Sequence, residues 1–270
     1  MGFYGPSQLV QDARRHGVEV RPVDAALSQW DCALEEGAVR LGLRVVGGLA
    51  AAAGGRITGN RPYASVAELA RRANLDRKDL KCLAAAGALQ SLAGHRRNAH
   101  WFASGIENDL PMEIPILEKN APALASPAEG EDILADYASL GLTLGRHPLA
   151  LLRDALSSRN MQAASAVNAS RRGSLVRIAG LVTCRQRPDT KSGVVFVTLE
   201  DESGCVNVVV WSDIFKRYRR EILGAQLLGV EGVIERKGQV VHLMARRFVD
   251  CSRLLARLLG PLAVASHDFH

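Results

Sequence analysis

The sequence has few aromatic residues, few cysteines and no long apolar run. Aromatic residues make up 5% of its 270 residues, so its cores must be built from Leu, Val and Ala. The five cysteines lie far apart and form no CxxC pair, which excludes a disulfide framework or a zinc site and is typical of a reducing compartment. No apolar run approaches the roughly 20 residues that cross a bilayer, and the N-terminus does not resemble a signal peptide. We therefore expect a cytoplasmic protein with no membrane partner.

Sequence patterns of catalysis are absent as well. No GxxxxGK[ST], HExxH or GxSxG is present, and no GxGxxG follows a predicted strand. His95 and His100 are five residues apart, which does not place them on one helix face as a metal-binding pair. Asp201 and Glu202 are adjacent, but they lie in a predicted hairpin turn, where a solvated pair is expected. The chain by itself reads as a binding unit with no catalytic residue, no metal and no cofactor.

Positive charge is concentrated in two blocks. Residues 40–100 contain eleven Lys and Arg against three Asp and Glu, and residues 171–253 contain fifteen against nine. The whole chain has a net charge of +6, so the remaining segments are net acidic. Such placed positive charge favours an anionic partner and is typical of nucleic-acid binding.

The first half of the chain predicts short helices separated by Gly turns. Ser65 with Glu68 forms a capping box, Asp76 can cap the next helix, and Gly87 can end it. Expected helices cover residues 6–17, 48–53, 65–73, 76–86 and 95–106, with short strands at 18–21 and 38–42. Residues 107–129 are acidic and contain four prolines, which predicts an extended linker.

The second half predicts a β-barrel after further short helices at 131–140, 149–157 and within 161–170. From residue 174 the apolar period becomes two. Expected strands are 175–182, 194–200, 205–211, 227–234 and 240–244, with a short helix at 212–218. Five strands with a helix between the third and fourth are typical of an OB-fold, which holds single-stranded nucleic acid or oligosaccharide. The predicted class is α+β with several domains.

Two glycine turns are the first candidate binding elements. A Gly turn before a helix can present backbone N–H groups to a phosphate without reading base identity. The alternative is that glycine serves only close helix packing, and neighbouring arginines favour DNA over that alternative. The candidate residues are Gly47, Gly48, Leu49, Ala50, Arg56, Gly87, Arg96 and Arg97.

The predicted barrel supplies the second set of candidates. Basic residues lie in the loop after its first strand and beside its short helix, and two aromatic residues lie in or at the end of strands where a base could stack. The alternatives are that Phe196 belongs to the core and that the Lys/Arg run is a solvated face. The candidates are Arg185, Arg187, Lys191, Phe196, Trp211, Lys216 and Arg217.

Four segments together resemble the C-terminal part of bacterial family C DNA polymerases. The segments are residues 1–24, Ala38–Leu43 with Gly47-Gly48-Leu49, Leu83–Arg97, and Asp136–Leu149. The error-prone branch, related to the DNA polymerase III alpha subunit, is most similar, over about residues 1–250. The resemblance implies that residues 1–36 end the fingers region, 37–106 form a tandem helix-hairpin-helix domain, 107–172 are a linker with short helices, 173–252 form an OB domain, and 253–270 are a tail.

The resemblance also implies a function for the whole enzyme: DNA-directed DNA synthesis by a nucleotidyltransferase, translesion synthesis and damage-induced mutagenesis. Partners would be double-stranded and single-stranded DNA, with other replication proteins. The family's catalytic carboxylates and Mg²⁺ belong to a palm domain that this sequence does not contain. A second departure is Ala50, where the family often has glycine. A non-enzymatic DNA-binding module or scaffold is the alternative, and the basic blocks disfavour an oligosaccharide ligand.

Overall fold

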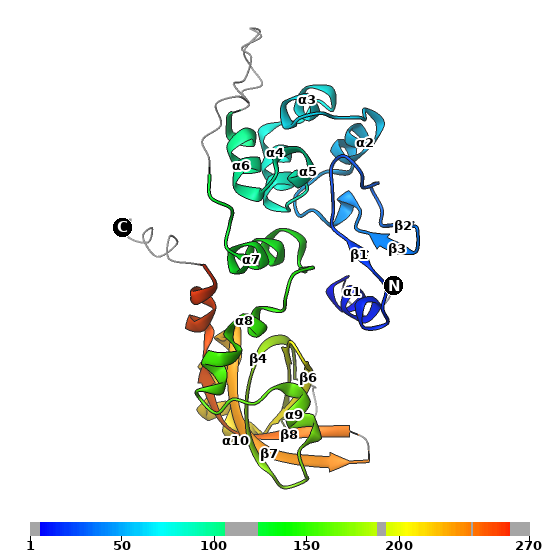
Figure 1. The fold of residues 1–270 in the computed structure, drawn as a ribbon. Helices are drawn as coiled ribbons and strands as arrows, with labels where there is room; N and C mark the ends of the chain where they lie inside the picture. The colour runs from blue at the N-terminus through cyan, green and yellow to red at the C-terminus, as the bar shows by residue number, and fades with distance from the viewer. Residues whose placement is uncertain (1–5, 106–123, 188–192, 239, 260–270) are drawn as a thin grey trace, which may run out of the picture. The chain divides into compact units, whose positions relative to one another are not determined.

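The computed structural model describes residues 6–105, 124–187, 193–238 and 240–259 (Figure 1). The chain divides into two compact units, Met1–Gly145 and Arg146–His270. We call them the hairpin unit and the barrel unit and describe each by itself. None of the described helices is long and apolar enough to cross a membrane.

The hairpin unit begins with helix α1 (Pro6–Arg15) and a small sheet. Its strands are β1 (Val20–Arg21), β2 (Ala33–Glu35) and β3 (Ala38–Arg40), in the order β1-β3-β2. The predicted strands at 18–21 and 38–42 are confirmed in shortened form, whereas β2 was not predicted. Its three residues give too short a pattern, and Glu36 and Gly37, both at positive φ, turn the chain back onto β3.

Short helices make up the rest of this unit. They are the 3-10 turn η1 (Leu43–Val45), α2 (Ala51–Gly59), α3 (Val66–Arg72), α4 (Arg77–Ala85), α5 (Gln90–Ala93), α6 (Arg96–Gly105) and α7 (Glu129–Leu140). Their aliphatic side chains form one core, with fully buried residues such as Leu69, Leu80 and Leu83. Side-chain oxygens of Ser65 and Asp76 accept from the third amide of α3 and α4, as the sequence predicts.

Two helices differ from the sequence-based expectation. Helix α2 begins at Ala51 rather than at residue 48, because Gly48 turns the chain with φ of +85° before the helix. It then continues through Gly54 and Gly55 to Gly59, although glycine weakens helices. The tight approach of Gly54 to Trp30 explains one of these glycines, since a Cβ there would lie 2.3 Å from the indole ring.

The barrel unit contains helices α8 (Pro148–Ser157) and α9 (Ala164–Ala169), followed by a closed barrel. The strands are β4 (Leu175–Gln186), β5 (Val195–Asp201), β6 (Gly204–Val210), β7 (Leu227–Lys237) and β8 (Val240–Asp250), in the order β4-β5-β6-β8-β7. Inward-facing aliphatic residues fill it, so the five-stranded barrel predicted from period-two patterning is confirmed.

Between β6 and β7 the structure has two helices, α10 (Ser212–Arg217) and α11 (Arg219–Gly224), where one was predicted. Strands β7 and β8 extend further than predicted, and η3 (Ser252–Leu259) follows β8. A register shift between Glu231 and Gly232 marks a bulge against β8. The bulge interrupts the period-two pattern of β8, so the predicted strand ended at residue 244 although β8 continues to Asp250. The predicted linker at 107–129 lies mostly outside the described residues.

Candidate nucleic-acid interface

The two glycines of the first turn have different roles: Gly47 allows close packing, and Gly48 adopts a positive φ. The Gly47 amide donates to the Ser139 carbonyl of α7 at 2.7 Å, and a Cβ on Gly47 would lie 2.8 Å from that oxygen. Gly48 has φ of +85°, a conformation that L side chains rarely adopt. Gly47 therefore serves close packing, and its amide is already used, whereas Gly48 makes the turn itself.

The N-terminus of α2 is exposed and uncapped. Ala50 is its N-cap residue with φ −78° and ψ 147°, and no side chain accepts a hydrogen bond there. The φ of Ala50 is negative, so alanine fits at this position, where the family that the sequence resembles often has glycine. Ala51 and Ala52 are exposed, and the first turn contains no acidic residue. First-turn amides of an α-helix have no intrahelical acceptor, so the amides of the exposed Ala51 and Ala52 are candidates to bind an anion.

A lysine on α4 is a further candidate near this turn, and the sequence did not single it out. The Cys82 sulfur would lie 3.0 Å from a Cβ on Gly48, and Lys78 is one helical turn before Cys82 on the same face. Lys78 is exposed, and among the described residues it makes no salt bridge. Burial raises the pKa of the Cys82 thiol, so the group under the turn is neutral. No local signal identifies Lys78, because the approach of Cys82 to Gly48 depends on the tertiary structure.

Other first-turn candidates are held by the protein itself. Leu49 is buried, and its amide donates to Val46. Arg56 donates to the carbonyls of Ala73 and Asn74, which end α3. Its guanidinium remains partly exposed, so the DNA contact predicted for Arg56 stays a prediction, while its visible role is to join α2 to α3.

The second glycine turn differs from the first because its backbone groups are satisfied internally. Gly87 has φ of +70° and ends α4, as predicted, and its amide donates to Ala84. Ala88 and Leu89, which follow it, are fully buried. A Cβ on Gly87 would lie 3.0 Å from a guanidinium nitrogen of Arg96, so this turn packs directly on that arginine.

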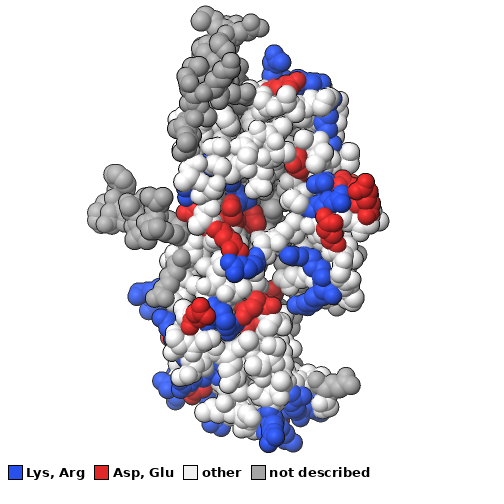
Figure 2. Space-filling view, viewed as in Figure 1, with Lys and Arg blue, Asp and Glu red and all other residues white. Residues whose placement is uncertain are grey.

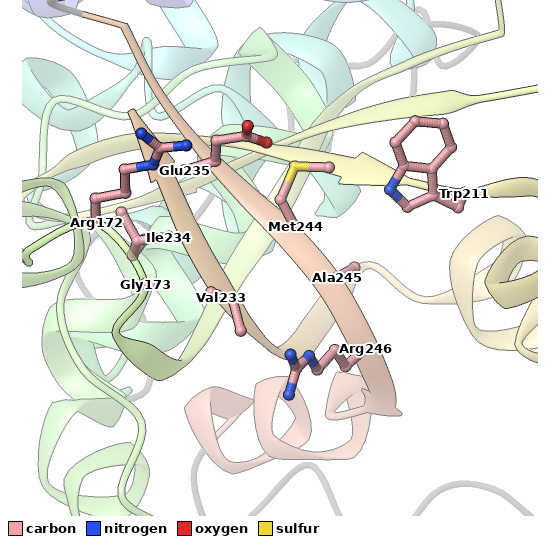
Figure 3. Close-up of a pocket in the computed structure, with 9 residues that line it drawn as sticks. All are labelled: Arg172, Gly173, Trp211, Val233, Ile234, Glu235, Met244, Ala245 and Arg246. Atoms are coloured by element: carbon pink, nitrogen blue, oxygen red, sulfur yellow. The ribbon is translucent and has the colours of Figure 1, made fainter. Parts of the chain in front are cut away.

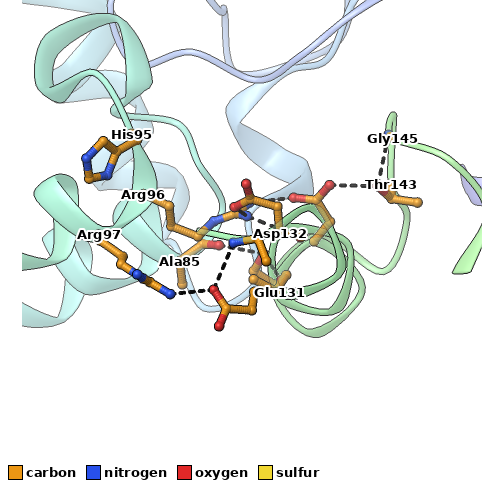
Figure 4. Close-up of polar contacts among 12 residues, drawn as sticks. Ala85, His95, Arg96, Arg97, Glu131, Asp132, Thr143 and Gly145 are labelled. Carbon is orange, nitrogen blue, oxygen red and sulfur yellow. Dashed lines mark hydrogen bonds and ion pairs between the residues drawn. The ribbon is translucent and has the colours of Figure 1, made fainter. Parts of the chain in front are cut away.

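The structure corrects the role of Arg96. Its guanidinium is buried and donates to the carboxylates of Asp132 and Asp136 on α7, where Asp136 also accepts from Thr143 (Figure 4). A guanidinium held between two carboxylates has no free face for a phosphate. Arg96 therefore joins the second turn to α7 and does not form part of an exposed DNA contact.

Arg97 lies beside it in a more open position. It donates to Glu131 at 2.6 Å and to the Ala125 carbonyl at 3.0 Å, and its side chain is partly exposed (Figure 4). Both arginines thus bind carboxylates of α7 in this structure. The predicted contact of Arg97 with DNA stays a prediction, but it would have to compete with Glu131.

Of four basic candidates in the barrel unit, two contact other parts of the protein and two are exposed on α10. Arg185 donates to the carbonyls of Ile222 and Ala225 at the end of α11, which fixes that helix to the barrel. Arg187 lies 5.4 Å above the Phe215 ring of α10 in a cation–π contact. Lys216 and Arg217 are exposed in the last turn of α10. Arg187, Lys216 and Arg217 form what we call the α10 cluster. Lys191 lies outside the described residues.

The two aromatic candidates of the barrel are both exposed. Phe196 points outward from β5 with 38% of its surface exposed, and Trp211, after β6, is 50% exposed. Phe196 is therefore not a core residue, since the core of β5 consists of the inward-facing Val195, Val197 and Leu199. Exposed aromatic rings beside Arg and Lys are the groups on which unpaired bases stack.

Charge is distributed differently over the two units. On the face that Figure 2 shows, Lys and Arg lie next to carboxylates in the hairpin unit, whereas they predominate over the lower part of the barrel. Among the described residues, no three His, Cys, Asp or Glu side chains lie together as metal ligands would.

Comparison with known proteins agrees with these two units. Residues 17–99 match the family model described as helix-hairpin-helix motif, and residues 176–250 match that of the OB-fold nucleic acid binding domain. Among solved structures, asparaginyl-tRNA synthetase from Pyrococcus horikoshii matches 34% of this chain and 23% of its own, at 19% identity and a TM-score of 0.27.

Curated relatives match the chain along its whole length. The error-prone DNA polymerase of Azoarcus sp. (strain BH72) is 53% identical to it, and that of Alkalilimnicola ehrlichii is 54% identical. The chain spans 26% and 27% of the lengths of these two proteins. Over its whole length the chain is therefore similar to about a quarter of each of these error-prone DNA polymerases, and its two units match the helix-hairpin-helix and OB-fold family models.

Proposed function

We propose that this chain is the DNA-holding part of an error-prone DNA polymerase. The hairpin unit binds the sugar-phosphate backbone of duplex DNA without reading its sequence, and the barrel binds the unpaired template strand. DNA synthesis, including translesion synthesis, belongs to the whole polymerase, whose Mg²⁺-dependent nucleotidyl transfer uses residues outside this chain.

The observation that carries the proposal is the exposed N-terminus of α2 after the Gly48 turn. Ala50, Ala51 and Ala52 are exposed, the first turn has no acidic residue, and the exposed Lys78 is one helical turn from Cys82, whose sulfur approaches Gly48. Helix N-termini carry partial positive charge and bind phosphate, and a lysine adds a full charge. Because the contacts use backbone groups, the duplex would be bound equally well for any sequence.

Support for the unpaired strand comes from the barrel. The α10 cluster supplies positive charge, and Phe196 supplies an exposed ring on β5. Nonspecific single-strand binding combines these two elements, with a basic surface for the backbone and rings for the bases.

Substitution of Ala50 tests the proposal. Ala50→Asp would cap α2 and stabilise the hairpin unit by about 1 kcal/mol, yet it would place a carboxylate where we expect a phosphate. Ala50→Asn is the matched control, because it caps the helix without charge. Duplex affinity is measured by fluorescence anisotropy of a labelled oligonucleotide over a salt series, and stability is measured by urea unfolding.

We expect Ala50→Asp to raise the stability of the hairpin unit and to weaken duplex binding several-fold. Its plot of log affinity against log salt would also be shallower, by about 0.9 for one lost phosphate contact. Ala50→Asn should gain the stability and keep most of the affinity. If Ala50→Asp binds duplex as tightly as the unchanged protein, the N-terminus of α2 is not the phosphate site.

A further inference from the structure

A groove on the outer face of the barrel lies next to Trp211 (Figure 3). Its volume is about 380 Å³, near the lower end of the ~300–1,000 Å³ range of small-ligand sites. Met244 and Val233 form its floor, and Arg172, Glu235 and Arg246 line its sides. Figure 3 shows the thioether end of Met244 pointing toward the Trp211 indole. The groove therefore has an apolar part bounded by an aromatic ring and a sulfur.

Strand register connects this groove to Phe196. Phe196 on β5 pairs with Val209 on β6, which pairs with Met244 on β8, which pairs with Val233 on β7. In an antiparallel or parallel ladder, paired residues lie on the same face. The outward row thus leads from the exposed Phe196 ring through Val209, which is only 8% exposed, to Met244 and Val233 in the groove.

The bulge in β8 directs positive charge toward the groove. Ala245 and Phe248 both face the core, so two residues, Arg246 and Arg247, lie between them where simple alternation cannot hold. Both arginines are exposed as a result. Arg246 lines the groove, and among the described residues it makes no salt bridge.

Glu235 fixes where a phosphate can lie. Glu235 and Arg172 line one end of the groove, and Figure 3 shows Arg246 at the other end. A carboxylate repels phosphate and offsets the charge of a neighbouring arginine. The Arg246 side is therefore the favourable position for an anion, and the Trp211–Met244 side is the favourable position for a base.

We infer that this groove binds one nucleotide of the unpaired strand, with its base against Trp211 and Met244 and its phosphate at Arg246. The inference rests on the proposed binding of single-stranded DNA by the barrel. It adds the position of one base and two residues, Met244 and Arg246, that sequence reasoning did not single out. The strand would continue along the outward row toward Phe196.

The test uses the full 270-residue chain and a labelled oligothymidylate of about 12 nucleotides, within the site size of one OB-fold. A second probe has the same phosphates but abasic sugars. Trp211→Ala is compared with Leu223→Ala, because Leu223 on α11 is equally exposed at 51% and does not line the groove. Arg246→Ala is compared with Arg253→Ala, an exposed arginine of η3.

We expect Trp211→Ala to weaken oligothymidylate binding about fivefold or more, as loss of one stacked base does. The same variant should bind the abasic probe as the unchanged chain does, and Trp211→Phe should retain most of the affinity. Arg246→Ala should make the salt dependence shallower by about 0.7 on both probes, since it removes one phosphate contact. The two control variants should match the unchanged chain.

Two results would overturn the inference in different ways. If the chain binds oligothymidylate but Trp211→Ala and Arg246→Ala behave like their controls, the groove does not bind the strand, and the proposed function stands. If the unchanged chain binds neither duplex nor oligothymidylate at low salt, the proposed function fails and the inference with it. Circular dichroism of each variant excludes unfolding as the cause of a loss.

Discussion

Removal of the Arg96 side chain should loosen the packing of α7 against the rest of the hairpin unit. Arg96 sits between Asp132 and Asp136, and its guanidinium also fills the space over Gly87. Arg96→Ala leaves two carboxylates close together without their cation and removes the packing under the second turn. The change therefore acts on stability and on α7, not on an exposed DNA contact.

The magnitude follows from burial. Removing one partner of a buried ion pair costs about 3–5 kcal/mol, because the other partner stays buried without compensation. Here the arginine side chain is 7% exposed, but those of Asp132 and Asp136 are 37% and 19% exposed, so water can rehydrate both carboxylates. We therefore expect a loss of about 2–3 kcal/mol. Arg97→Ala should cost about 1 kcal/mol or less, since its pair with Glu131 is more exposed.

Hydrogen exchange of the α7 amides measures this loss locally. A cost of about 2 kcal/mol corresponds to exchange roughly 30-fold faster in Arg96→Ala. Urea unfolding of the hairpin unit gives the same difference by a second method. Arg71→Ala, at an exposed arginine of α3, is the control and should change neither measurement. Unchanged α7 exchange in Arg96→Ala, or a larger effect in Arg97→Ala, would refute the reasoning.

Three further substitutions test the glycine turn and the partly buried His147. Gly48→Ala should destabilise the hairpin unit by about 1–2 kcal/mol, because Gly48 has a positive φ. Gly55→Ala should stabilise the unit by about 0.5–1 kcal/mol, because a Cβ at this position in α2 meets open space. Equal effects of the two substitutions in urea unfolding would contradict this reasoning. Burial lowers the pKa of His147, so its stability contribution is complete above pH ~6.5 and is lost as pH falls through the folded pKa. His147→Asn keeps an N-cap acceptor for α8 without titrating, so its melting temperature should depend less on pH between about 7.5 and 5.5 than that of the unchanged chain.

The electrostatic surroundings of His147 set the size of that pH effect. Its Nε2 lies 3.7 Å from Glu200, and Arg153 binds Asp201 and Glu202 nearby. The three carboxylates oppose the effect of burial, and Arg153 adds to it. A melting temperature with the same pH dependence in both proteins would show that the folded pKa of His147 is not lowered.

Much of the fold could be read from local sequence. Ser65 and Asp76 cap helices through contacts within three residues, and Gly87 ends a helix by its own conformation. Period-two patterning identified all five barrel strands, because alternation records which face of a strand is buried. The bulge at Arg246 was missed, since it depends on how β8 pairs with β7.

The candidate site was less predictable than the fold. Sequence alone placed Gly48, Trp211 and the two basic blocks, and these properties are local: a turn conformation, a residue type and a local charge. Only the tertiary structure decided which charges remain available. Arg96 is held in ion pairs with carboxylates 36 and 40 residues away in the sequence, whereas Lys78 and Arg246 remain exposed. Ion pairing depends on distance in space rather than in sequence, so the chain determined where positive charge is concentrated and folding determined which of it can meet a phosphate.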